Sequence, residues 1–242
     1  MIVQQTENGW QVIYHRAHAL LAAQIAGYWH KDSIPTRFFE TLAAIAQHDD
    51  LEREWEEDQL TEAGAPLDFT LNRESSIKQL TRLIEGAQYR GRWVALMTSM
   101  HVSFLNEANR GASKEWDRFL DHLRQQQQQW QQDLGVDKQD VERTYNFMRW
   151  CDRLSLILCQ QQLPANERLL EITVGPDDQR YNVVQYQNGW VEVMPWPFFE
   201  EKFTVNVEAT CLSQVSFSSN QALTEALKAA PIKILEWTFA KS

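Results

Sequence analysis

The sequence predicts a mainly α fold built on an all-α bundle. A β-hairpin is expected before this bundle and a β-rich portion after it, so that the chain is α+β overall. Apolar residues recur every three or four positions over most of residues 1–165, which is the period of helices that bury one face. From residue 166 onward, apolar and polar residues alternate as they do in strands. We therefore expect a helical domain over 1–165 and a β-rich portion over 166–242 that packs on the helices.

The N-terminal residues predict the hairpin. Ile2-Val3 and 10–14 are strand-like and flank Asn8-Gly9, a pair that tolerates positive φ in tight turns. The helices expected after it cover about 16–29, 36–49, 77–87, 93–108, 116–129 and 141–163, where Pro164 ends the last one. The strands expected in the β-rich portion cover 170–174, 181–184, 190–193, 203–209, 215–217 and 232–239, with a helix at 222–229. Residues 50–73 are acidic and irregular, and we expect a loop there.

The composition excludes several functions. The net charge is −10, and Lys and Arg form no cluster of the kind that grips nucleic acid. No segment reaches the apolar length of a membrane span, and the N-terminus lacks the features of a signal peptide. The three cysteines have no CxxC spacing and are expected to be reduced thiols. We expect a cytoplasmic protein without nucleic-acid or membrane partners. A small anionic partner is still compatible with the charge, because a bound cation reverses the local field. The oligomeric state is left open.

Polar residues interrupt the apolar faces of four predicted helices. His18 shares a face with Leu21 and Ile25, and Asp49 in the pair His48-Asp49 continues an apolar face. His101 follows Met97 on an apolar stripe, and Asp152 lies in the middle of another. A buried carboxylate must be neutralised, paired or bound to a metal.

Two explanations fit these positions. Each residue alone has an ordinary structural explanation, as a hydrogen-bonded core histidine or as an aspartate paired with an arginine. Helical bundles also build metal sites from side chains on facing helices, and imidazole with carboxylate suits Zn, Mn, Fe, Ni or Mg to differing degrees. From the residues alone, a metal centre and a buried hydrogen-bond network both stay open.

The order of these residues resembles a known superfamily. His18, then His48-Asp49, then Asp152 at the start of Asp-Arg-Leu-Ser, is similar to the pattern of the HD metal-dependent phosphohydrolases. More narrowly, the chain resembles an uncharacterised bacterial family called domain of unknown function 3891. The matching elements are Met1-Ile2-Val3, Gly9-Trp10, His18, His48-Asp49-Asp50, Trp55-Glu56, Gly64-Ala65-Pro66 before Asp68-Phe69, Ser99-Met100-His101 and Cys151 to Leu156. Leu51 departs from that pattern, since glycine commonly follows the His-Asp-Asp run.

The resemblance implies an HD-like helical bundle with a divalent metal (Mn, Fe, Zn, Ni or Mg) held by His18, His48, Asp49 and Asp152. It implies catalytic roles for Asp49, which can bridge to a second metal, and for His101, as a second-metal ligand, general acid or phosphate contact. Asp50 could support a ligand histidine as a hydrogen-bond acceptor, and its ordinary explanation is a surface residue at the end of the helix. The implied reaction is attack by metal-activated water on a phosphorus ester of a small phosphorylated or nucleotide-like compound.

A second function stays open beside this one. The chain could be a non-enzymatic sensor or interaction module that uses an aromatic cluster, Trp190, Trp196, Phe198 and Phe199, as a contact surface. Packing of that cluster onto the helices is its ordinary explanation. The acidic run 52–58 could cover the site or form a solvated face. Arg73, Lys78 and Arg82 could meet a substrate anion, although nothing in the sequence prefers them over other surface bases.

Overall fold

The structure is a computed structural model that describes residues 1–50, 58–71 and 76–242. Four sequence interpretations concern residues outside these ranges. They are the departure at Leu51, the matching element Trp55-Glu56, the acidic run up to Glu57, and Arg73.

The predicted helices are confirmed in the described part of the chain. Their bounds are α1 (His15–Gly27), α2 (Phe38–Gln47), α3 (Ile77–Gln88), α4 (Arg92–Asn106), α5 (Lys114–Leu134), α6 (Lys138–Cys159) and α7 (Asn220–Ala229). Helix α6 begins at an N-cap, because the Asp137 carboxylate accepts a hydrogen bond from the Gln139 amide at 2.7 Å. It ends earlier than the sequence predicts, since Gln161 adopts a φ of 53° that no α-helix continues through.

The strands form one sheet that joins both ends of the chain. They are β1 (Ile2–Thr6), β2 (Gly9–Ile13), β3 (Leu170–Val174), β4 (Arg180–Gln185), β5 (Val191–Met194), β6 (Lys202–Leu212) and β7 (Ile232–Ala240). Their order across the sheet is β1-β2-β6-β7-β5-β4-β3. Neighbouring strands are antiparallel, except that β5 and β7 are parallel.

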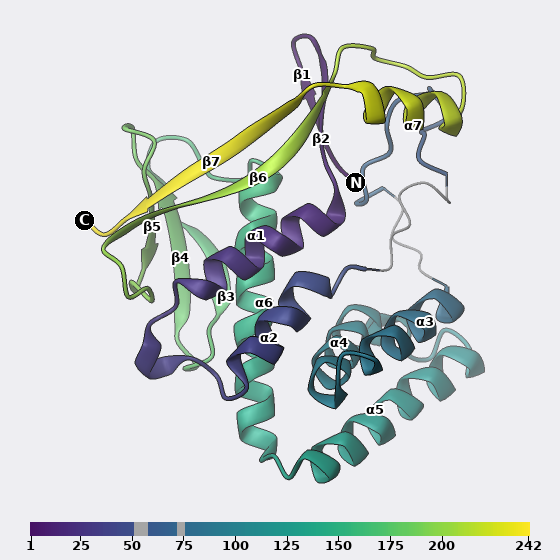
Figure 1. The fold of residues 1–242 in the computed structure, drawn as a ribbon, viewed down its shortest axis with the longest axis vertical. Helices are drawn as coiled ribbons and strands as arrows, with labels where there is room; N and C mark the ends of the chain where they lie inside the picture. Colours follow the sequence, from purple (N-terminus) through teal and green to yellow (C-terminus); the bar gives the residue numbers. More distant parts are fainter. Residues whose placement is uncertain (51–57, 72–75) are drawn as a thin grey trace.

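The prediction of a mainly α, HD-like bundle is therefore wrong, and so is the description of the chain as all-α. Helices make up 47% of the described residues and a curled, mixed, seven-stranded sheet makes up 21% of them, so the sheet is a second layer of the fold. The reason lies in non-local pairing, which residue periodicity does not reveal. Trp10 of β2 pairs with Leu212 of β6, so the N-terminal hairpin belongs to the same sheet as the C-terminal strands (Figure 1). The division of the chain at residue 165 stays a prediction.

Two local details also differ from the sequence prediction. The N-terminal hairpin is confirmed, but its turn is Glu7-Asn8, and Gly9 is the first residue of β2 with a φ of 127°. A Cβ at Gly9 would overlap the carbonyl oxygen of Leu212, which explains why glycine is needed there. The strand predicted at 215–217 is not formed. Instead, the Phe217 amide donates to the carbonyl oxygen of Gly64 at 2.7 Å, so the segment packs on a loop.

Helices α1 and α6 connect the sheet to the other helices. Helix α1 contacts α2, α6 and β6, whereas α6 contacts β3 and α4 as well (Figure 1). Aromatic rings fill the space between the layers, where Trp29, two residues after α1, lies edge-to-face against Trp150 of α6 and against Phe198. Phe198 is thus buried in the core, while Trp190 and Phe199 of the same aromatic cluster are partly exposed. The position of α1 between sheet and helices fixes the site described below.

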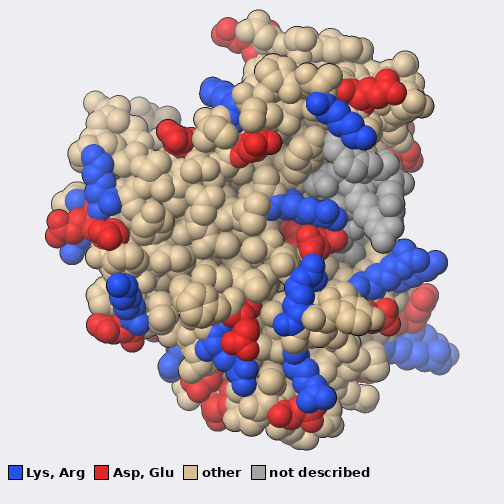
Figure 2. Space-filling view, viewed as in Figure 1, with Lys and Arg blue, Asp and Glu red and all other residues tan. Residues whose placement is uncertain are grey.

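The helix lengths, the surface charges and the cysteines can be compared with the expectations drawn from the composition. Every helix in the described residues is too short or too polar to cross a membrane. On the face shown in Figure 2, basic side chains are interspersed with acidic ones. All three cysteines are free thiols, and Cys151 and Cys159 are buried. The absence of a nucleic-acid partner stays a prediction.

Candidate metal centre

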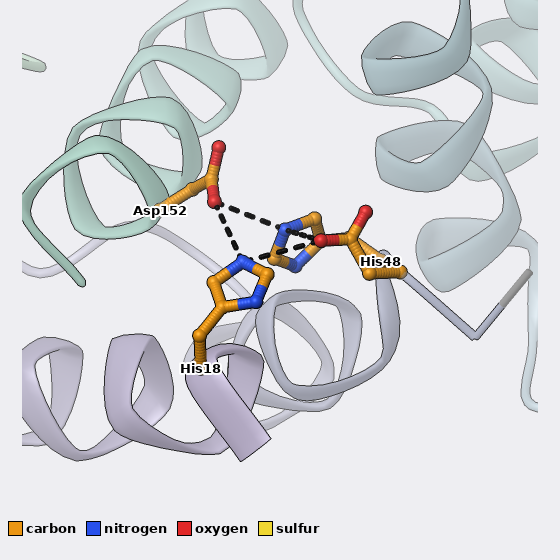
Figure 3. A group of neighbouring side chains, drawn as sticks. His18, His48 and Asp152 are labelled. Atoms are coloured by element: carbon orange, nitrogen blue, oxygen red, sulfur yellow. Dashed lines mark hydrogen bonds and ion pairs between the residues drawn. The ribbon is translucent and has the colours of Figure 1, made fainter. Parts of the chain in front are cut away.

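Three separate segments direct polar side chains to one point. His18 lies in α1, His48 and Asp49 directly follow the last residue of α2, and Asp152 lies in the middle of α6. Because α1 packs on both α2 and α6, these segments meet although more than 100 residues separate Asp49 from Asp152 in the sequence. Figure 3 shows the side chains of His18, His48 and Asp152 pointing toward one another, from α1, from the turn after α2 and from α6.

The four polar ends form a closed arrangement. The Nε2 atom of His18 lies 3.2 Å from Asp152 Oδ1 and 3.2 Å from Asp49 Oδ2. The Nε2 atom of His48 lies 3.1 Å from Asp152 Oδ1 and 3.2 Å from Asp49 Oδ2. Each imidazole therefore lies between the same two carboxylate oxygens, and all four ligand atoms lie within 4.8 Å of one another.

This arrangement fits a divalent cation. Nitrogen and oxygen ligands bound to one transition-metal ion at about 2.0–2.2 Å lie about 3 Å from their neighbours, which matches the observed spacing. Two imidazoles and two carboxylates are also a donor set that such ions accept. The histidine side chains are fully buried, whereas those of Asp49 and Asp152 are 20% and 15% exposed. The cluster could thus hold a metal ion that solvent or a substrate reaches from the carboxylate side.

The orientation of His48 supports this assignment. Its Nδ1 lies 2.7 Å from the carbonyl oxygen of Ile45, one turn earlier. Since a carbonyl oxygen only accepts, Nδ1 carries the proton and donates it. A bond of this kind fixes the tautomer of a metal-binding histidine and leaves Nε2 for the metal. Nε2 is the atom that His48 directs at the two carboxylates.

His48 and the carboxylates of the cluster shift one another's pKa values. Burial alone would lower the pKa of His48, but the carboxylates of Asp49 and Asp152 together raise that pKa well above its usual value. Burial would raise the pKa of each carboxyl group, but the neighbouring histidines, His48 foremost, lower the pKa of both well below the usual range. In the metal-free protein the two carboxylates are thus stabilised by a proton on His48, a positive charge that a metal ion can replace.

His101 of α4 lies beside the four candidate ligands. Its ring centre is 4.8 Å from that of His48, and its Nδ1 is 3.4 Å from the hydroxyl oxygen of Tyr145. Burial, reinforced by the positive charge of His48, lowers the pKa of His101 to about 4. The structure therefore places a neutral histidine next to the cluster.

Asp50, the expected support of a ligand histidine, lies next to arginines. The Nε atom of Arg16 is 3.4 Å from Asp50 Oδ1, and an Nη2 atom of Arg90 is 3.4 Å from Asp50 Oδ2. These side chains are partly exposed to solvent. Asp50 thus forms a second charged group at the surface, one residue away from Asp49, and its supporting role stays a prediction.

His15 is a residue that the sequence analysis missed. Its Nδ1 lies 3.7 Å from Asp49 Oδ2, and its ring is edge-on to that of His18 with a centre distance of 5.1 Å. His15 and His18 are three residues apart, so they share a face of α1. This spacing could have revealed His15, but the predicted helix began at Arg16 and excluded it.

Fold and site together define an α+β protein with a candidate divalent-metal centre between helices. Residues 1–214 match the family described as protein of unknown function (DUF3891), and the chain therefore belongs to this family. The matched range contains all four candidate ligands and ends after β6. Comparison with curated proteins and with solved structures gave no match.

Proposed function

We propose that the protein is a divalent-metal-dependent phosphohydrolase that acts on a small phosphorylated or nucleotide-like compound. The observation that carries the proposal is the convergence of His18, His48, Asp49 and Asp152. Their order along the chain, an isolated His, a His-Asp pair and a distant Asp, also supports a relation to the HD superfamily. That relation concerns the ligand set and the three segments that carry it, and the seven-stranded sheet is no part of it.

The residues of the cluster have distinct tasks in this proposal. A divalent ion held there would lower the pKa of water and shield the charge that develops on a phosphoryl group. His18 and His48 hold the ion from the buried side. Asp49 and Asp152 hold it from the partly exposed side, where the substrate enters.

His101 supplies a hydrogen bond to the reacting group. In this proposal the hydroxyl group of Tyr145, 3.4 Å from Nδ1 of the neutral imidazole, donates to that nitrogen, so that the ring proton of His101 is carried by Nε2. That N–H can donate to an oxygen of the phosphoryl group or of the leaving group. General acid–base groups of this kind contribute roughly 10²–10⁴-fold to a rate.

Arg16 and Arg90 support an anionic substrate. The chain has a net charge of −10, which by itself repels anions. The two guanidinium groups form ion pairs with the carboxylate of Asp50, the residue after Asp49. Positive charge therefore lies close to the cluster. Arginine binds phosphate oxygens through paired hydrogen bonds, and a substrate phosphate could share these donors with Asp50.

The test is a panel assay on metal-loaded protein. Protein freed of metal and then loaded with Mn²⁺, Mg²⁺, Zn²⁺ or Ni²⁺ is incubated with phosphomonoesters, phosphodiesters and nucleotides, and released phosphate or alcohol is measured. We expect turnover with at least one metal and none after chelation. Stoichiometric metal binding without turnover across the panel would contradict the proposal and favour a non-enzymatic sensor.

His101→Gln separates catalysis from metal binding. The glutamine side chain keeps a hydrogen-bond donor but no ring, so we expect turnover to fall by about 10²-fold. Metal content should be unchanged, because His101 is not among the four converging ligands. Tyr145→Phe is the matched control, because it removes the hydroxyl group that contacts Nδ1 of His101 and keeps the imidazole. It should lower turnover less than His101→Gln does.

A further inference from the structure

The outer edge of β7 has no neighbouring strand over most of its length. Strands β6 and β7 pair from Lys202 opposite Ala240 to Thr210 opposite Ile232. On its other side β7 pairs with β5 at a single position, Val191 opposite Phe239. In the described part of the chain, residues 232–237 of β7 therefore pair with β6 and with no other strand. Figure 1 shows β6 and β7 as a long two-stranded ribbon.

The register shows which backbone groups face this edge. The Cys211 amide donates to the carbonyl oxygen of Pro231, and the Lys241 amide donates to that of Glu201, both at 2.9 Å. Odd-numbered residues of β7 thus belong to the hydrogen-bonded pairs with β6. In an antiparallel ladder these pairs alternate with non-bonded ones, so the even-numbered residues direct their N–H and C=O groups away from β6. On the open edge these residues are Ile232, Ile234 and Glu236.

The opposite edge of the same ribbon is capped. Asn206 of β6 lies opposite Glu236, and its N–H and C=O groups face away from β7. The side chain of Gln24 in α1 binds both, accepting from the Asn206 amide at 3.1 Å and donating to its carbonyl oxygen at 2.9 Å. Proteins often cover sheet edges in such ways. Among the described residues, no side chain caps Glu236 in this manner.

Side chains along the open edge fit an extended peptide. Ile232 and Ile234 are 58% and 48% exposed, which is high for isoleucine in a strand. A hollow of about 450 Å³ lies beside the edge on the helical side. Its lining includes Leu158, Leu163, Leu235 and Trp237, together with the charged residues Lys233 and Glu236. On the outer face, Glu208 and Glu236 are exposed beside Ile234.

We propose that the β7 edge binds an extended segment of a partner protein in which apolar residues alternate with Lys or Arg. The segment adds a strand by pairing with the backbone of Ile232, Ile234 and Glu236. Alternate side chains then enter the hollow, and those between them lie on the outer face near Glu208 and Glu236. Charge selects this occupant, because a second copy of the chain brings the same glutamates and a net charge of −10. The proposal is independent of the metal centre.

The first test uses a labelled synthetic peptide of seven residues in which lysine and valine alternate. Its binding to the full chain is measured by fluorescence anisotropy. Two further peptides carry backbone N-methyl groups on either all lysines or all valines. Since only alternate N–H groups of an added strand face β7, we expect one N-methylated peptide to lose binding and the other to keep it. Equal binding of the two, or no binding of the parent peptide, would overturn the proposal.

The second test changes the protein. Ile234→Pro removes one outward N–H, and proline is tolerated where that group faces solvent at a sheet edge. We expect about tenfold weaker peptide binding, the equivalent of one lost hydrogen bond. The matched variant Ile234→Val keeps the N–H and should bind as the wild type does. Equal binding by Ile234→Pro and Ile234→Val, both folded by circular dichroism, would overturn the proposal. So would a wild-type dimer that Ile234→Pro abolishes, because a second copy would then occupy the edge.

Discussion

Asp49 and Asp50 are neighbours in the sequence, yet their carboxylates have different partners. Asp50 lies between the guanidinium groups of Arg16 and Arg90, which carry a permanent positive charge. Asp49 lies among the imidazoles of His15, His18 and His48, which are positive only when protonated. The charge of Asp50 is therefore balanced within the protein. The cluster around Asp49, which also includes Asp152, needs a proton or a metal ion.

The largest effect is expected on metal affinity, when a carboxylate of the cluster around Asp49 is removed by mutation. Asp152→Ala removes an oxygen that both His18 and His48 contact, so we expect metal affinity to fall by more than the roughly 10–100-fold that loss of a supporting residue costs. Affinity is measured by competition with a chromophoric chelator. Wild-type affinity in a folded Asp152→Ala protein would remove Asp152 from the ligand set.

Metal removal should destabilise the protein. A ligand at 100 times its dissociation constant stabilises the folded state by about 2.7 kcal/mol. For a chain of this size that corresponds to an increase of about 5–10 °C in the melting temperature. Thermal unfolding is followed by circular dichroism with Mn²⁺ and with EDTA. Identical melting temperatures would indicate that the cluster is a hydrogen-bond network without a metal.

The stabilisation by metal should grow with pH. The pKa of His48 is raised in the folded state, so its contribution to stability is present below its unfolded pKa of about 6.5 and is lost as the pH rises through its folded pKa. The pKa values of Asp49 and Asp152 are lowered, so their contribution is present above about pH 4 and is lost in acid.

The metal-free protein should therefore lose stability as the pH rises above about 6.5, while the metal-loaded protein keeps it because the ion replaces the proton. Melting temperatures at pH 6, 7.5 and 9, with Mn²⁺ and with EDTA, measure this difference. A difference that shrinks toward pH 9 would contradict the account.

The smallest effect is expected at Asp50. Its arginine partners are partly exposed, and exposed ion pairs contribute about 0–1 kcal/mol. Asp50→Asn should therefore change the free energy of unfolding by less than about 1 kcal/mol in urea titrations and leave the metal content intact. Loss of the metal in this variant would show that Asp50 belongs to the cluster.

The sequence predicts those parts of the molecule that depend on local pattern. Helical periodicity located α1, α2, α4 and α6, and polar residues on the predicted apolar faces drew attention to His18, Asp49, His101 and Asp152. The set His18, His48, Asp49 and Asp152 was implied only by the family resemblance, and these four are the side chains that converge. The pairing of Trp10 with Leu212 depends on contacts across the whole chain, so the single sheet could not be predicted in this way. The arginines on Asp50 were missed for a similar reason, since Arg16 and Arg90 approach it from different helical segments.

Elemental analysis of the purified chain decides whether His18, His48, Asp49 and Asp152 bind a metal ion. Protein is incubated with Mn²⁺, Fe²⁺, Zn²⁺, Ni²⁺ or Mg²⁺, desalted, and analysed beside Asp152→Ala and Asp50→Asn. We expect about one divalent ion or more per chain in the wild type and in Asp50→Asn, and almost none in Asp152→Ala. Folded wild-type protein that retains no ion under any of these conditions would contradict this expectation.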